Sequence, residues 1–89
     1  MFEWDEKKRE INLSKHGIDF IDAKEIWQRH VLEIESPQAQ HDEKRFLAIG
    51  EMSGICITVI YTWRDKTRRI ISARRARDNE KEAYSHATR

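Results

Sequence analysis

The sequence predicts one α+β domain, with two N-terminal helices, a four-stranded and mainly antiparallel sheet, and a C-terminal helix. Three observations support this prediction. The chain has 89 residues, enough for one domain and too few for two. Apolar residues recur at helical spacing before residue 28 and alternate with polar residues after it. The connections between the later segments are three or four residues long, which favours antiparallel neighbours.

Capping residues mark both expected N-terminal helices. Asp5 is suited to begin a helix that continues to about residue 15, and Gly17 is suited to end it. This first helix has few apolar residues and is expected to be mostly exposed. Asp19 begins a second helix that continues to about residue 28. Its apolar face, expected to pack on the sheet, consists of Phe20, Ala23, Ile26 and Trp27.

Four strands and a final helix are expected in the rest of the chain. The expected strands are residues 31–35, 45–51, 55–63 and 68–74. A loop over residues 38–43 separates the first two strands, and Gly54 provides a positive φ angle in a tight hairpin between the next two. The final helix is expected from residue 76 to about residue 84. The last three strands therefore form an antiparallel meander with helices on one face.

Positive charge is concentrated in one segment. The formal net charge is +1, yet residues 64–77 contain seven basic residues and one acidic residue. Their balance is +6, so the rest of the chain sums to −5. A cationic surface on an otherwise acidic body is typical of proteins that bind a polyanion. A solvated basic strand is the alternative.

Arginine occurs on both sides of the expected fourth strand. Alternation places Arg68, Ile70, Ser72 and Arg74 on one side, and Arg69, Ile71 and Ala73 on the other. The helices can cover only one face of the sheet. The open face is therefore expected to present arginines beside hydroxyl groups, which suits a phosphodiester.

Membrane-spanning proteins are excluded by the hydropathy pattern. The longest purely apolar stretch has only four residues, whereas a spanning helix needs about 20. The first residues are charged from position 3 and include no apolar stretch typical of a secretion signal. The chain is therefore expected to be cytoplasmic.

Neither a metal site nor a reactive thiol is expected. Cys56 is the only cysteine, and its apolar neighbours favour a small buried residue over a catalytic thiol. Glu33 and Glu35 share one side of a strand, but no Asp or His motif completes a metal site. Both are expected to form a solvated edge, as edge strands are commonly protected by charge. No cofactor is expected.

Short blocks in order along nearly the whole chain form a specific pattern. They are Phe2-Glu3-Trp4-Asp5, Lys15-His16-Gly17, Phe20-x-x-Ala23, Glu43-x-Arg45-Phe46, Ile49-Gly50, Val59-x-Tyr61-Thr62-x-Arg64 and Arg69-Ile70-Ile71-Ser72-Ala73-Arg74. The pattern resembles the BrnT toxins of bacterial type II toxin-antitoxin systems, except that Trp27 stands where the family usually has phenylalanine. The resemblance implies a RelE-like fold, RNA cleavage without a metal, and neutralisation by a BrnA-type antitoxin in a heterotetramer that contacts operator DNA only through the antitoxin.

Metal-free RNA cleavage requires proton transfer and fixed positive charge at the phosphate. Arg64 and Arg74 are expected to hold the phosphate because each ends a strand, although Arg64 could be an ordinary turn residue. His16 is either a catalyst or a charge that caps a helix end. Tyr84 is a further catalytic candidate, but it lies one turn from Glu80, so helix packing is its alternative. The expected RNA-binding residues are Arg45, Lys66, Arg68, Arg69, Arg75 and Arg77.

Two other classes of function remain open on the same scaffold. One is a noncatalytic module that binds nucleic acid or a protein partner. The other is a protein that inhibits another enzyme by contact. Composition does not separate these classes from an endoribonuclease. The discriminating observation is whether the purified protein, free of metal, leaves cyclic phosphate ends on RNA.

Overall fold

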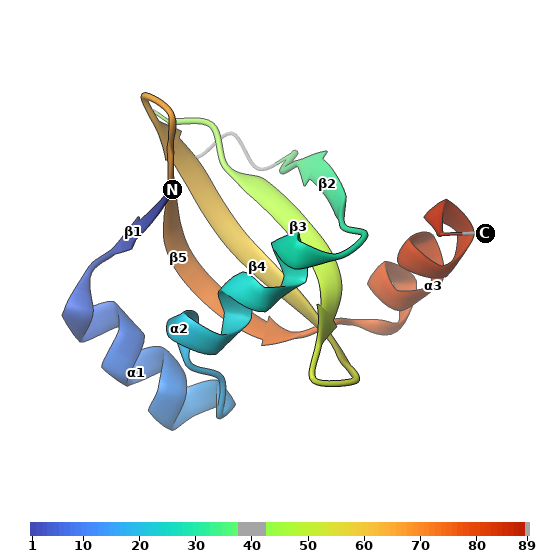
Figure 1. The fold of residues 1–89 in the computed structure, drawn as a ribbon, viewed down its shortest axis with the longest axis horizontal. Helices are drawn as coiled ribbons and strands as arrows, with labels where there is room; N and C mark the ends of the chain where they lie inside the picture. Colours follow the sequence, from blue (N-terminus) through green and yellow to red (C-terminus); the bar gives the residue numbers. More distant parts are fainter. Residues whose placement is uncertain (38–42, 89) are drawn as a thin grey trace.

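A five-stranded mixed sheet forms the centre of the structure, a computed structural model that describes residues 1–37 and 43–88 (Figure 1). Its order is β1-β5-β4-β3-β2, and every neighbouring pair is antiparallel except β1 and β5. The strands are β1 (Phe2–Trp4), β2 (Leu32–Glu35), β3 (Phe46–Met52), β4 (Ile55–Arg64) and β5 (Thr67–Arg75). The helices are α1 (Glu6–His16), α2 (Phe20–Ala23), the 3-10 helix η1 (Lys24–Gln28) and α3 (Asp78–Ala87). The α+β class and the antiparallel meander are confirmed, and residues 38–42 of the expected loop lie outside the described residues.

The expected four-stranded sheet is wrong by one strand. Residues Phe2–Trp4 form β1, which pairs in parallel with β5, so that Phe2 lies beside Arg68 and Trp4 beside Ile70. Three residues are too few to show an alternating pattern. The strand forms because β5, more than sixty residues later in the chain, offers it a free edge.

The expected second helix is also divided. α2 ends at Ala23, and the chain tightens into the 3-10 helix η1. Ile26 in η1 lies directly on β3, where a Cβ at Gly50 would approach the Ile26 Cβ to 2.8 Å. Only glycine allows the backbones to approach this closely. The expected apolar face is confirmed, because Phe20, Ala23 and Ile26 are fully buried and Trp27 packs against them.

The predicted ends of α1 are confirmed, and a buried asparagine attaches the helix to the sheet. The Asp5 carboxylate accepts hydrogen bonds from the first turn, and Gly17 ends the helix at a φ angle of 71°. Asn12 is the one buried residue of α1. Its amide donates to the Ala73 carbonyl at 2.8 Å and its oxygen accepts from the Ala73 N–H at 3.0 Å. These bonds fix α1 against β5.

A bulge in β5 changes which of its side chains share a face. Ile60 pairs with Ser72, whereas the next residue, Tyr61, pairs with Ile70. Ile71 is therefore the extra residue of a β-bulge, and the alternation of β5 is reversed there. The expectation that residues 68, 70, 72 and 74 share one side is wrong.

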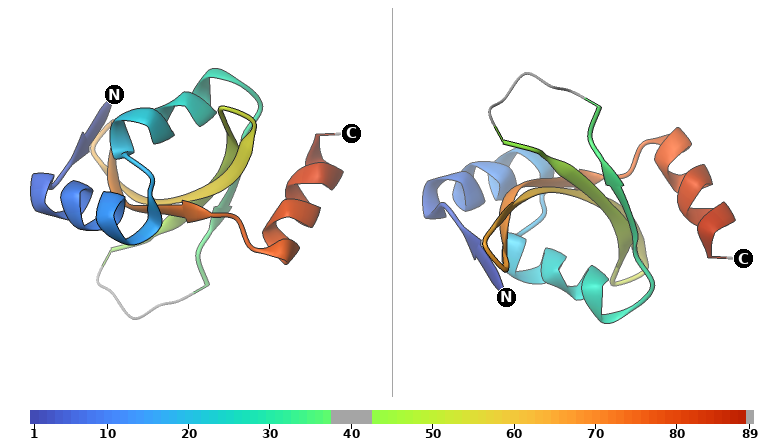
Figure 2. Two further views of the ribbon diagram at one scale, coloured as in Figure 1. Left: turned by 90° about the horizontal axis from the view of Figure 1, so that it is seen from below. Right: turned by 90° about the horizontal axis from the view of Figure 1, so that it is seen from above.

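The two faces of the sheet differ in their covering. Figure 2 shows the strands curving around α2 and η1, which bury one face, while α3 stands apart beyond the end of β5. Because of the bulge, Arg68 and Ile70 lie on the covered face, beside Trp63 and Tyr61. Beyond the bulge, Ser72 and Arg74 lie on the opposite face. None of the described helices is long and apolar enough to cross a membrane.

Candidate nucleic-acid interface

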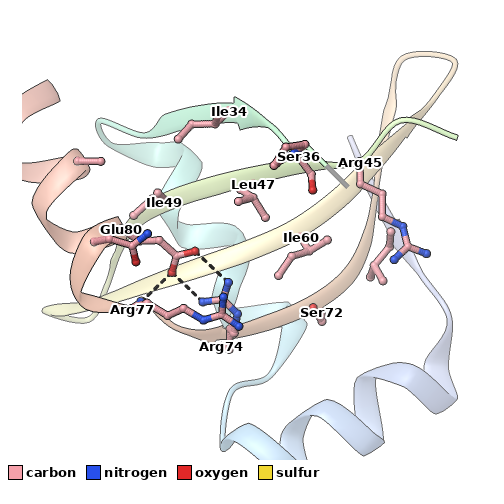
Figure 3. A pocket seen from close by; sticks show the side chains of 14 residues that line it. Ile34, Ser36, Arg45, Leu47, Ile49, Ile60, Ser72, Arg74, Arg77 and Glu80 are labelled. Carbon is pink, nitrogen blue, oxygen red and sulfur yellow. Dashed lines mark hydrogen bonds and ion pairs between the residues drawn. The ribbon is translucent and has the colours of Figure 1, made fainter. Parts of the chain in front are cut away.

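A groove of about 500 Å³ lies on the open face of the sheet beside α3 (Figure 3). Arg74 and Arg77 lie at its α3 end, and Arg45 lies at the other end. The hydroxyl of Ser72 lies between them. We call this hollow the arginine groove. The apolar side chains that line it are Ile34, Pro37, Leu47, Ile49, Ile60, Ile71 and Ala83.

Two of the three arginines in the groove carry unbalanced charge. Within the described ranges, neither Arg45 nor Arg77 forms an ion pair. The Nε of Arg45 is buried and has no hydrogen-bond partner among these residues. A buried donor without a partner is costly.

The third arginine, Arg74, is held by a carboxylate from α3. Its guanidinium donates to Glu80 through two hydrogen bonds, of 2.7 and 2.9 Å. The same carboxylate accepts from the Thr58 hydroxyl at 3.0 Å and from the Arg77 backbone N–H at 2.7 Å. Glu80 is only 7% exposed.

These contacts lower the pKa of Glu80 to about 2, with the Arg74 hydrogen bonds as the main cause and burial acting against it. Glu80 is therefore ionised at neutral pH and is a poor proton acceptor. Its effect is to orient the guanidinium of Arg74 at the edge of the groove.

On the covered face, Arg68 belongs to an aromatic cluster. Its guanidinium lies 4.9 Å from the Trp27 ring and 4.5 Å from the Trp63 ring. Glu33 accepts hydrogen bonds from Arg68 at 3.0 Å, from Trp27 at 3.0 Å and from Tyr61 at 2.7 Å. Burial alone would raise the pKa of Glu33, but these three donors lower it. Glu33 and Glu35 are exposed on the edge strand β2, as expected. The sequence did not reveal that the Glu33 carboxylate also joins β2 to the start of β5.

The comparison with known families fits this open cationic groove. A sequence model of the family described as "Ribonuclease toxin, BrnT, of type II toxin-antitoxin system" matches residues 4–80. The chain belongs to the BrnT toxin family. Ribonuclease toxins of type II toxin-antitoxin systems act on RNA and are paired with an antitoxin. The match extends from β1 to Glu80 and so includes the strands that form the arginine groove. None of the curated proteins compared with the chain matches it.

In this BrnT-family chain, the structure separates Arg64 from Arg74. Arg64 is exposed at the end of β4, where it pairs with Thr67, whereas Arg74 pairs with Thr58. Thr58 and Arg64 are six positions apart in β4, which corresponds to about 20 Å at about 3.3 Å per residue. One phosphate cannot contact both side chains. A role for Arg64 stays a prediction that no contact in the structure supports.

The other expected RNA-binding residues are also divided between surfaces. Arg45 and Arg77 line the groove. Arg69 forms an ion pair with Glu3 at 2.6 Å, and Arg75 is exposed opposite Ile57. Lys66 lies in the β4–β5 turn and Arg68 lies in the aromatic cluster, and neither lines the groove.

His16 and Tyr84 have different relations to the groove. His16 ends α1 and lines a small hollow together with Ile71 and Ser72, two residues that also line the groove. Tyr84 lies outside the groove lining, and its hydroxyl donates to the His30 carbonyl at 3.0 Å. The structure thus places His16 in a hollow next to the groove and does not bring Tyr84 to Arg74.

The described residues offer neither a metal centre nor an activated thiol. No group of three or more His, Cys, Asp or Glu side chains comes together in residues 1–37 and 43–88. Cys56 is partly buried, and burial raises the pKa of its thiol. A thiol with a raised pKa is a poor nucleophile.

One residue that shapes the site was missed from the sequence. Asn12 fixes α1 beside the bulge of β5, and His16 and Ser72 line the same small hollow there. Asparagine is a weak helix former, so its position in the middle of a helix is the one available signal. The partner atoms of Asn12 belong to residues 61 positions later, and no local pattern reveals them.

Proposed function

We propose that this BrnT-family toxin is a metal-independent endoribonuclease whose active site is the arginine groove. The single observation that carries the proposal is the placement of Arg45, Arg74 and Arg77 around one apolar floor on an uncovered sheet face. Guanidinium groups bind phosphate oxygens in pairs, and aliphatic side chains can pack against bases and riboses. The groove thus offers guanidinium groups to the phosphates of a single-stranded RNA and an apolar floor to its bases and riboses.

The reaction that suits this site is attack by a ribose 2′-oxygen on the adjacent phosphorus. The new bond joins the 2′-oxygen to phosphorus, and the bond to the 5′-oxygen breaks. The products are a 2′,3′-cyclic phosphate and a 5′-hydroxyl. One proton leaves the 2′-hydroxyl and one is gained by the 5′-oxygen, while the phosphoryl oxygens gain negative charge.

The proposal assigns three roles in this reaction. Arg77 and Arg74 stabilise the charge that develops on the phosphoryl oxygens. Glu80 is a positioning residue, since it orients Arg74 and its low pKa makes it unsuitable as a base. His16, in the adjacent hollow that shares Ile71 and Ser72 with the groove, is the candidate for proton transfer.

Independence from metal ions is supported by the charges at the groove. All its cationic groups are guanidinium groups, and its buried carboxylate, Glu80, is already engaged by Arg74, Thr58 and the Arg77 N–H. Fixed guanidinium groups can supply the stabilisation that a metal ion supplies in other nucleases.

The antitoxin is proposed to cover the same groove. Its apolar floor and arginine rim fit a segment that combines apolar anchors with carboxylates, and charge complementarity speeds such association. The proposal also includes a BrnA-type antitoxin, a heterotetramer of toxin and antitoxin, contact with operator DNA only through the antitoxin, and a RelE-like scaffold. These four features follow from the resemblance to BrnT toxins.

The experiment that tests the active site compares two exposed arginines. Arg77→Ala should lower the cleavage rate by about a hundredfold, because it removes a charge that acts in the transition state. Its backbone N–H still donates to Glu80, so the protein should stay folded. Arg75→Ala is the matched control and should lose one phosphate contact at most, because Arg75 lies outside the groove.

Equal rates for the two variants would contradict the assignment of the groove. Tight RNA binding without cleavage by the unmodified protein would instead favour the noncatalytic binding module. Each variant is compared with the unmodified protein per folded molecule, with the folded fraction taken from a thermal melt.

A further inference from the structure

A second hollow, of about 220 Å³, lies between α1 and β5. Two of its lining residues, Ile71 and Ser72, also line the arginine groove. The two hollows are therefore adjacent and share the bulged part of β5. The residues that α1 contributes include Lys8, Ile11, Lys15 and His16. We call this hollow the α1 notch.

The cations of the α1 notch are held in a fixed relation to the groove. Asn12 bonds to both backbone groups of Ala73, the residue that follows Ser72. Lys8 and Lys15 lie four residues before and three residues after Asn12, on the same face of the helix. Both side chains therefore project beside the bulge.

The two lysines carry unpaired charge. Neither Lys8 nor Lys15 forms an ion pair with any residue in the described ranges, whereas Arg9 on the same helix pairs with Glu6 and Asp19. A cation in the last turn of a helix, such as Lys15, is stabilised by the helix dipole. Lys8 lies in the first turn, where the dipole opposes a cation, so helix stabilisation does not account for it.

We infer that the α1 notch is a second phosphate-binding subsite, in which Lys8 and Lys15 hold the backbone of the RNA strand whose scissile phosphate lies in the arginine groove. This inference rests on the proposed function. The strand would cross β5 at Ser72 and continue along α1. The site would then prefer RNA that is several nucleotides long, since a short fragment fills the groove alone.

The test measures how affinity depends on RNA length and salt. The probes are 2′-O-methyl RNAs, which cannot be cleaved, of about 12 nucleotides and of two nucleotides. For the double variant Lys8→Gln/Lys15→Gln, affinity for the longer RNA should fall about tenfold. The slope of log K against log salt should become shallower by about 1.4, because each of the two lost phosphate contacts contributes about 0.7. Affinity for the two-nucleotide RNA should change less than about twofold.

The matched control is Lys7→Gln/Lys81→Gln, which removes the same charge from exposed lysines outside both hollows. An equal loss of affinity in both double variants would show a general charge effect and overturn the inference. An unchanged affinity in Lys8→Gln/Lys15→Gln would overturn it as well. If the unmodified protein neither binds nor cleaves RNA, the proposed function itself fails, and that outcome is distinct from a failure of the notch alone.

Discussion

The carboxylate of Glu80 makes a contribution to stability whose size follows from its surroundings. It accepts hydrogen bonds from Arg74, Thr58 and the Arg77 N–H, and its pKa falls from an ordinary value of 4.5 to about 2. Each pKa unit corresponds to 1.36 kcal/mol, so ionised Glu80 stabilises the fold by about 3 kcal/mol. Glu80→Ala should therefore lower the free energy of unfolding by about 3 kcal/mol at pH 7, which is more than about 10 °C in Tm.

The loss should depend on pH in a defined direction. Because the pKa of Glu80 is lower in the folded protein than in the unfolded chain, its contribution is fully present above about pH 4.5. It disappears as the pH falls from 4.5 towards 2. The difference between Glu80→Ala and the unmodified protein should shrink over the same interval.

Urea unfolding, followed by tryptophan fluorescence at a series of pH values, measures this difference. The control is Glu82→Ala on the same helix, whose side chain is 76% exposed. It should change the free energy of unfolding by less than about 0.5 kcal/mol. A loss below about 1 kcal/mol for Glu80→Ala at pH 7, or a loss independent of pH, would refute the reasoning.

Two further predictions concern polar groups away from the groove lining. Asn12→Ala should lower the free energy of unfolding by about 2–3 kcal/mol, since both buried backbone groups of Ala73 lose a partner. Ser14→Ala on the exposed side of α1 is its control, and a similar result for the two would count against the role of Asn12. Glu33→Gln should cost about 1–2 kcal/mol, because an amide replaces the charged acceptor of Arg68. Cleavage per folded molecule should be retained in Glu33→Gln, and a large loss would mean that the covered face takes part in the reaction.

Features set by local chemistry could be predicted from the sequence. The cap at Asp5, the end of α1 at Gly17 and the hairpin turn at Gly54 each depend on a few neighbouring residues. The apolar face of residues 20–27 follows from periodicity in the same way. All of these predictions are confirmed.

Features that depend on distant residues could not be predicted. β1 is a strand only because β5 lies beside it, and the bulge at Ile71 reverses the alternation on which the faces of β5 were assigned. The charge pattern predicted the cationic segment, but it did not show which of its arginines form ion pairs. Arg68 is engaged by Glu33 and Arg69 by Glu3, and these carboxylates lie 35 and 66 residues away in the sequence.

The central claim is that the arginine groove cleaves RNA without a metal ion. The most direct measurement is the chemistry of the product ends, after end-labelled RNA is incubated with the purified protein in EDTA. The account predicts 2′,3′-cyclic phosphate and 5′-hydroxyl ends in EDTA, and products from Arg77→Ala reduced by about a hundredfold. Cleavage that stops in EDTA and returns with magnesium, or products with 3′-hydroxyl and 5′-phosphate ends, would contradict it.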